Sequence, residues 1–221
     1  VLTFAGVVSG AGSLVQAGSG TLTLTGANTY TGGTTISSGT VQVGDGGTSG
    51  SLAGDVLNDG ALIFNRSNAS SFAGAISGTG RLETSGTGTL TLSGTNSFTG
   101  ATTVSGGTLA IMGGASLADG ARLTIASGAA LSLVDADETV GSVTGAGDIA
   151  LNSHCLTTGG DGTSSSFSGA ISGSGCLNKT GAGTMTLTGT NTYTGTTTVS
   201  APATAAQSPA AATTEIAAVS V

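Results

Sequence analysis

One sixteen-residue phrase occurs three times in this chain and constrains its fold more than any other feature. It reads GTLTLTGANTYTGGTT from Gly20, GTLTLSGTNSFTGATT from Gly88 and GTMTLTGTNTYTGTTT from Gly183. A phenylalanine lies 16 residues before each of these glycines, at Phe4, Phe72 and Phe167. Self-similarity over a fixed length is the signature of a repeat architecture, in which each unit packs against its neighbours.

Within each phrase, apolar residues alternate with threonine. The apolar positions are Leu22 and Leu24, Leu90 and Leu92, and Met185 and Leu187. A period of two over about five residues, bounded by Gly and Asn, is typical of a short β-strand with one buried face. Helical periodicity is absent over residues 1–200, so the repeats are predicted to be β-structure.

The composition favours one β-architecture over the others. Aromatic residues make up only 3% of the chain and Gly reaches 41 residues, whereas sandwiches draw on varied strands and larger core side chains. With 38% hydrophobic residues and only two Pro, the chain is not a disordered polyelectrolyte either. We therefore expect an all-β fold, a single-stranded parallel right-handed β-helix (solenoid), with coils of roughly 20–27 residues.

Two regions follow from the repeat pattern. Residues 1–200 are predicted to form the β-helix, with repeat units anchored near 4–44, 72–113 and 167–200. Residues 201–221 are predicted to form an irregular or short helical tail rich in Ala, Thr and Pro, in which Ser208 and Pro209 could begin a helix. The first residues start inside a repeat unit, so we interpret the chain as a fragment of a longer protein.

Charge excludes two classes of partner. The chain has eleven acidic residues and four scattered basic residues, Arg66, Arg81, Arg122 and Lys179, and its net charge is −7. Such a chain offers no basic footprint for nucleic acid and none for an anionic membrane surface. No apolar stretch approaches the roughly 20 residues that a membrane-spanning helix needs.

The two cysteines are the most specific candidate site. Cys155 and Cys176 lie 21 residues apart, about one coil, and each precedes a leucine expected to point inward. They should therefore face outward on adjacent coils, where strand spacing suits a disulfide. A disulfide and two free thiols both remain open; a catalytic thiol beside His154 lacks an orienting partner, and the same three residues lack a fourth zinc ligand.

No catalytic, cofactor or metal site is predicted. Asp135, Asp137 and Glu138 could supply oxygen ligands to Ca²⁺, but a solvated turn is the favoured interpretation. The GDGGTSGSLAGD stretch, with Asp45 and Asp55, lacks the recurring period of calcium-binding repeats. Dispersed acids and four basic residues do not make a polysaccharide-cleaving centre, although that class of enzyme stays as a less favoured alternative.

The recurrent aromatic and asparagine residues have structural interpretations. The aromatics are expected to pack within coils or over their corners, with sugar stacking as the alternative: Phe4, Tyr30, Phe72, Phe98, Phe167 and Tyr193. Asparagines recur next to predicted corners, where stacked side chains could bond along the rod: Asn28, Asn96 and Asn191.

Several motifs resemble the passenger-associated transport repeat of bacterial autotransporters. They include GAGTMTLTGTNTYTGTTTVS, FNRSNASSFAGAISGTGRL and TVGSVTGAGDIAL. The resemblance covers residues 1–200 and implies a β-helical passenger segment of a Gram-negative bacterium, secreted or displayed at the cell surface. It implies one partner, the parent protein's own C-terminal outer-membrane barrel, which is absent from this chain. The resemblance implies a structural role in export, folding and display, within a parent protein that is an adhesin in some relatives. The alternative is an adhesive module that binds glycans or other copies of itself. No enzymatic activity is expected.

Overall fold

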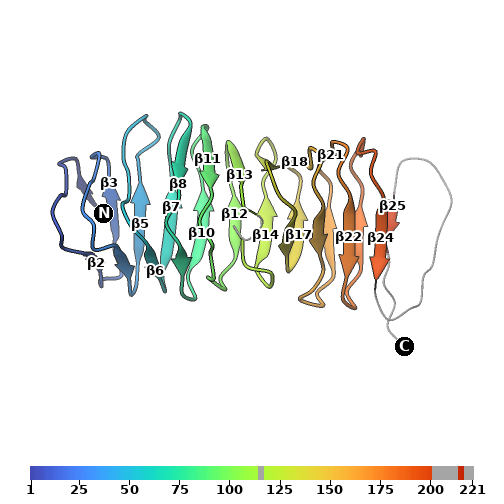
Figure 1. The fold of residues 1–221 in the computed structure, drawn as a ribbon, viewed down its shortest axis with the longest axis horizontal. Helices are drawn as coiled ribbons and strands as arrows, with labels where there is room; N and C mark the ends of the chain where they lie inside the picture. The colour runs from blue at the N-terminus through green and yellow to red at the C-terminus, as the bar shows by residue number, and fades with distance from the viewer. Residues whose placement is uncertain (114–116, 201–213, 217–221) are drawn as a thin grey trace.

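The structure is a computed structural model, which describes residues 1–113, 117–200 and 214–216. All regular elements in these residues are β-strands, and no helix is present among them. Figure 1 shows the strands stacked side by side along a rod, with the chain advancing steadily from the N-terminal end to the other. The predicted parallel β-solenoid is confirmed.

One long sheet runs the length of the rod and contains eleven strands. In spatial order they are β1 (Leu2–Phe4), β3 (Thr21–Leu24), β5 (Thr40–Val43), β7 (Ala61–Phe64), β10 (Arg81–Thr84), β12 (Thr102–Val104), β14 (Arg122–Ile125), β17 (Ser142–Gly145), β20 (Ser165–Phe167), β23 (Met185–Leu187) and β25 (Thr214–Ile216). The first ten pair in parallel, one per coil, so the solenoid has about ten coils.

Three shorter sheets form the remaining sides. A six-stranded sheet contains β8 (Ser70–Phe72), β11 (Thr89–Leu92), β13 (Thr108–Ile111), β15 (Ala130–Leu133), β18 (Asp148–Ala150) and β21 (Ile171–Ser172). The N-terminal four-stranded sheet contains β2 (Leu14–Gln16), β4 (Thr34–Ile36), β6 (Val56–Asn58) and β9 (Ile76–Ser77). The C-terminal four-stranded sheet contains β16 (Glu138–Val140), β19 (Leu156–Thr158), β22 (Leu177–Thr180) and β24 (Thr197–Ser200).

Register in the long sheet is set by the sequence repeat. Leu2 pairs with Leu22, Leu22 with Val41, and Val41 with Leu62. Partners along this sheet lie 19 to 22 residues apart, at the short end of the range expected from the spacing of the repeated phrases. Apolar residues are thereby stacked on apolar residues, so side chains of the same kind fill the same site in these coils.

The core is a continuous aliphatic column inside the coils. Two inward rows run along the long sheet; one contains Leu22, Val41, Leu62 and Leu82, and the other runs beside it. Most members of these rows are less than 6% exposed. The alternation read from the sequence is thus the alternation between core and solvent.

Each end of the solenoid differs from its middle. No described coil lies before β1, so Leu2 is 65% exposed and Phe4 is 43% exposed. At the other end, β25 pairs with β23 in the antiparallel sense. The tail was predicted to be irregular or helical; its described part, residues 214–216, is a strand, and the helix start expected at Ser208 and Pro209 lies outside the described residues.

The corner asparagines bond differently from the stacked side-chain ladder expected for them. Asn96 Oδ1 accepts from the backbone N–H of Ile76 at 2.8 Å, and Asn191 Oδ1 accepts from that of Ile171 at 3.0 Å. Asn28 Oδ1 likewise accepts from Val8, again 20 residues back. Each amide therefore satisfies a backbone donor of the preceding coil, which the strand ladder leaves unpaired at the corner.

Candidate functional site

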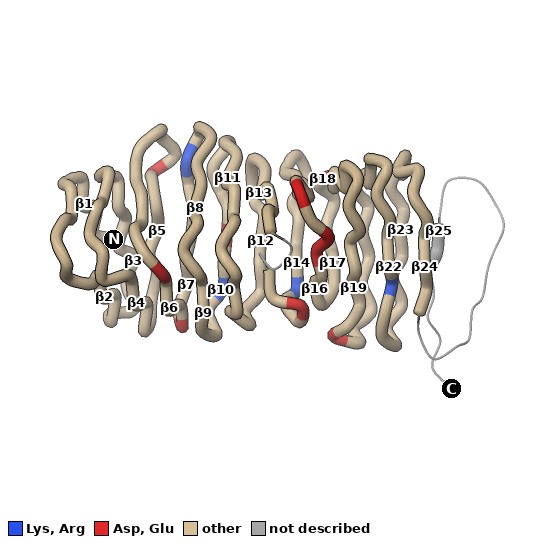
Figure 2. The backbone as a smooth tube through the Cα atoms, in the orientation of Figure 1, with Lys and Arg blue, Asp and Glu red and all other residues tan. Residues whose placement is uncertain are grey.

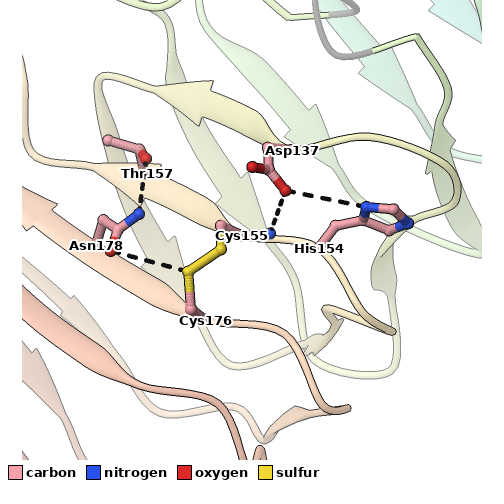
Figure 3. Close-up of a disulfide and its surroundings, with 6 residues drawn as sticks. All are labelled: Asp137, His154, Cys155, Thr157, Cys176 and Asn178. Carbon is pink, nitrogen blue, oxygen red and sulfur yellow. Dashed lines mark hydrogen bonds and ion pairs between the residues drawn. A yellow bond between two sulfur atoms is a disulfide. The ribbon is translucent and has the colours of Figure 1, made fainter.

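The two cysteines meet on adjacent coils of the C-terminal four-stranded sheet. Leu156 pairs with Leu177 in the parallel register, which sets Cys155 beside Cys176 just before the two strands. Their Cα atoms lie 4.4 Å apart and a disulfide joins the sulfurs, as Figure 3 shows. Both leucines are fully buried, so the cysteines sit at the outer side of the coil. That this disulfide forms in the native protein stays a prediction.

The residues around the disulfide connect three successive coils, those of β16, β19 and β22. Asp137 Oδ1 accepts from the backbone N–H of Cys155 at 2.7 Å and lies 3.9 Å from His154 Nδ1. On the other strand, Asn178 Nδ2 donates to Thr157 Oγ1 at 3.4 Å (Figure 3). The Asp137 carboxylate therefore bonds the backbone of the next coil. Together with the disulfide, these contacts hold successive coils together.

The acidic turn is less solvated than its sequence suggests. Asp135 Oδ1 accepts from the backbone N–H of Gly113 at 2.7 Å, so this carboxylate bridges two coils. Glu138 is only 1% exposed, and its Oε1 accepts from the N–H of Leu117 at 3.3 Å. The interpretation as a solvated turn is wrong for Glu138, because its side chain points into the coil.

Other aspartates use the same coil-to-coil bond. Asp55 Oδ1 accepts from Ala75 N–H at 2.8 Å, and Asp59 Oδ1 from Thr79 N–H at 3.0 Å. Asp148 Oδ1 accepts from Ala170 N–H at 3.2 Å. Figure 2 shows how few charged residues the rod carries, and several of its carboxylates serve to close corners. Among the described residues, no group of three or more His, Cys, Asp or Glu is placed to hold a metal ion.

Arg66 organises the longest described loop, residues 44–55. Its guanidinium donates to the carbonyl of Thr48 at 2.6 Å and to that of Gly50, and it also bonds Asn68 Oδ1. Asp45 lies in the same loop and its Oδ1 accepts from Gly47 N–H at 3.3 Å, a local turn. The Arg66 guanidinium thus donates mainly to backbone carbonyls of this loop.

Lys179 occupies an inward position that no sequence motif indicates. In β22 it stacks on Thr158 and beneath Val199, and it is 0% exposed. Its Nζ donates to the carbonyls of Thr180 and of Gly181, the latter at 3.0 Å. Burial lowers the pKa of Lys179 from its ordinary value, while the nearby Asp161 carboxylate opposes that change.

Asp161 is the carboxylate whose charge acts on Lys179. Loss of some solvation acts to raise the pKa of the exposed Asp161, but the Ser142 hydroxyl, two hydrogen bonds from Thr163 and the Arg122 charge together hold the pKa below its ordinary value. Asp161 Oδ1 accepts from both the N–H and the hydroxyl of Thr163 at 2.9 Å. An ionised Asp161 is therefore favoured beside the buried ammonium.

Most of the recurrent aromatics pack, as expected. Tyr30, Phe98 and Phe167 are at most 1% exposed, and Phe72 is 5% exposed. The Tyr30 hydroxyl is 2.6 Å from Thr34 Oγ1, and Tyr193 makes the equivalent contact with Thr197. Phe4 is the exception, because no described coil covers it. Stacking of sugars on the buried members of this set is excluded.

No helix in the described part of the chain could span a membrane.

Comparison with known proteins identifies the repeats. Residues 14–43, 82–111 and 177–201 match the family described as the passenger-associated-transport-repeat. A segment of 43 residues is 51% identical to the adhesin BmaC autotransporter of Brucella suis biovar 1 (strain 1330). That segment is 20% of this chain and only 1% of the adhesin. No solved structure matches the chain.

The matched segments coincide with the architecture. Each begins on a strand and crosses strands of more than one sheet, from β2 to β5, from β10 to β13 and from β22 to β24. The chain thus carries three passenger-associated-transport repeats stacked in one parallel β-solenoid, and over 43 residues it is similar to an autotransporter.

Proposed function

We propose that residues 1–200 are a structural, non-enzymatic segment of a passenger that is displayed at the surface of a Gram-negative bacterium. In this role the rod supports export and folding of the parent protein and holds more distal parts away from the membrane. The partner during export is the parent's own C-terminal outer-membrane barrel. Support comes from the repeat family and from the similarity to an autotransporter.

The observation that carries the proposal is the way in which coils contact one another. Each parallel strand pairs only with strands one coil before and one coil after it. Corner bonds follow the same rule: Asn96 reaches Ile76, and Asp59 reaches Thr79. Stability is then a sum over neighbouring coils, and folding can propagate from one end. Coil-by-coil folding outside the cell would oppose backsliding of the chain during export.

Deleting residues 167–200 from the parent protein should slow its appearance at the cell surface, because the last coils of this rod would no longer be available to start the stack. The rate is measured by pulse–chase labelling with protease shaving of intact cells. An export rate equal to that of the unmodified parent would refute the role in folding-driven export.

A matched control removes one whole coil from the middle. Deleting residues 82–101 joins Arg81 to Thr102, which in the intact chain sits directly above Leu82 in the register. The strands on either side can then pair as before, so export should proceed at the parental rate. If both deletions slow export equally, the effect is one of length and the vectorial explanation is wrong.

Adhesion is the second candidate. It is favoured by the name of the similar protein, an adhesin, although the matched part is a small share of that protein. The outward faces are rich in hydroxyls; for example, Thr124 and Thr144 stack with their Oγ1 atoms 3.1 Å apart. Glycans and second copies of the chain are the two kinds of ligand that such faces fit.

A further inference from the structure

The outer face of the N-terminal four-stranded sheet is hollowed. The hollow has a volume of about 340 Å³ and lies where β4, β6 and β9 stack. Thr35, Leu57 and Ser77 are register partners along its length, and Thr31 and Asp55 lie before the strands on the same side. This volume is within the range of about 300–1,000 Å³ that small-molecule sites occupy.

Two glycines leave part of the hollow as bare backbone. Gly32 and Gly33 both line it, and Gly33 has φ of +75°. A Cβ atom added at Gly33 would lie 2.8 Å from the carbonyl oxygen of Asp55, so a larger residue would both strain the backbone and collide with the next coil. The close approach of the next coil therefore requires glycine at position 33.

The lining combines hydrogen-bonding groups with one apolar surface. Asp55 is exposed, and its Oδ1 accepts from Ala75 N–H at 2.8 Å. Among the described residues none donates to its Oδ2, which leaves that oxygen to accept a hydrogen bond from a ligand. Leu57 points outward and is 44% exposed. Thr31, Thr35 and Ser77 add hydroxyls that can donate or accept.

Charge narrows the class of ligand. The lining contains one carboxylate and no Lys or Arg among its residues, in a chain of net charge −7. An anionic ligand would meet repulsion without a cationic partner. A pyranose ring has an apolar face and a rim of hydroxyls that need acceptors, and it carries no charge in neutral sugars. Leu57 offers a surface to the ring face, and Asp55 Oδ2 offers an acceptor to the hydroxyls.

We infer that this hollow binds a neutral saccharide, through Asp55 and Leu57. The inference rests on the adhesive candidate above and assigns it a place on the molecule. For a single sugar in an open, shallow site, the dissociation constant is expected to be on the order of 1–10 mM.

The test is a titration of the purified chain with methyl β-D-galactopyranoside, methyl α-D-mannopyranoside and N-acetylglucosamine, followed by ¹⁵N–¹H chemical shifts. At least one probe should shift the amides of residues 31–35, 55–57 and 77. Asp55→Asn keeps the bond to Ala75 and removes only the charged acceptor, and Leu57→Ser removes the apolar surface. Each variant should weaken binding by about 5-fold or more.

Matched controls share the chemistry but lie outside the hollow. Asp59→Asn alters another corner aspartate, and Val15→Ser alters a 57% exposed residue in the same outward row as Leu57. Both should leave the dissociation constant unchanged. Absence of shifts at 50 mM of every probe, equal weakening by the controls, or tighter binding of glucuronate would overturn the inference. Because binding is measured on the purified chain, this outcome is independent of the export experiment.

Discussion

Substituting Gly169 by alanine should lower the free energy of unfolding of the surrounding coils by about 3 kcal/mol, the upper part of the range for overpacking. A Cβ atom at this position would overlap the carbonyl oxygen of Gly147 in the preceding coil. Gly189 stands in the same relation to Gly169, so these glycines form a column in which backbone lies directly on backbone. The collision is with the main chain, which cannot rotate away as a flexible side chain would.

The measurement is urea unfolding combined with hydrogen exchange of amides in β17, β20 and β23. Gly120→Ala is the matched control, because a Cβ atom there would have no other atom within 4 Å. Its effect should be within about 0.5 kcal/mol of zero, as for an uncrowded surface site. Similar losses for Gly169→Ala and Gly120→Ala would contradict the argument from close stacking.

Removing the disulfide should lower the free energy of unfolding by a similar amount. The bond between Cys155 and Cys176 closes a loop with a sequence separation of 21 residues. A cross-link of that size restricts the unfolded chain by about 3 kcal/mol in the loop-entropy account. We therefore expect reduction, or the double substitution Cys155→Ala with Cys176→Ala, to lower the free energy of unfolding by about this amount. Protection from hydrogen exchange should fall most in β19 and β22.

Reductant gives the control for this prediction. Reductant should lower the free energy of unfolding of the unmodified chain and leave that of the double alanine variant unchanged. Mass spectrometry of the non-reduced protein should show the peptides of Cys155 and Cys176 linked. Two free thiols in protein collected from the cell surface would contradict the proposed disulfide. Equal stability with and without reductant would contradict its contribution to stability.

The architecture was predictable because the repeat shows it directly. Leu24, Leu92 and Leu187 occupy equivalent positions in three phrases, and all are buried, as their alternation with threonine predicts. The placement of Cys155 beside Cys176 followed from coil length and from the inward leucines after them. Periodicity and repeat length therefore suffice when successive coils are nearly the same.

The details that could not be predicted depend on contacts between coils of different sequence. Asn96 was expected to bond another asparagine, yet its oxygen serves a backbone amide, because the corner leaves that donor unpaired. Lys179 interrupts an inward row, and only its two-residue spacing from Leu177 signals this position. The hollow at Asp55 and Leu57 depends on which residues of three successive coils come together, and a sequence pattern does not report this.

Cross-linking between register partners tests most directly that this chain is one continuous parallel stack. Thr103 pairs with Thr124, and Thr124 with Thr144, on the outer face of the long sheet. Parallel neighbours lie about 4.8 Å apart, inside the reach of a disulfide, whereas strands two coils apart lie beyond it at about 9.6 Å. In the double alanine background, cysteines at 103 and 124, or at 124 and 144, should form a disulfide under mild oxidation, and cysteines at 103 and 144 should not. Efficient linkage of 103 to 144, or none between neighbours, would contradict the stack and with it the account of the protein as a coil-by-coil passenger rod.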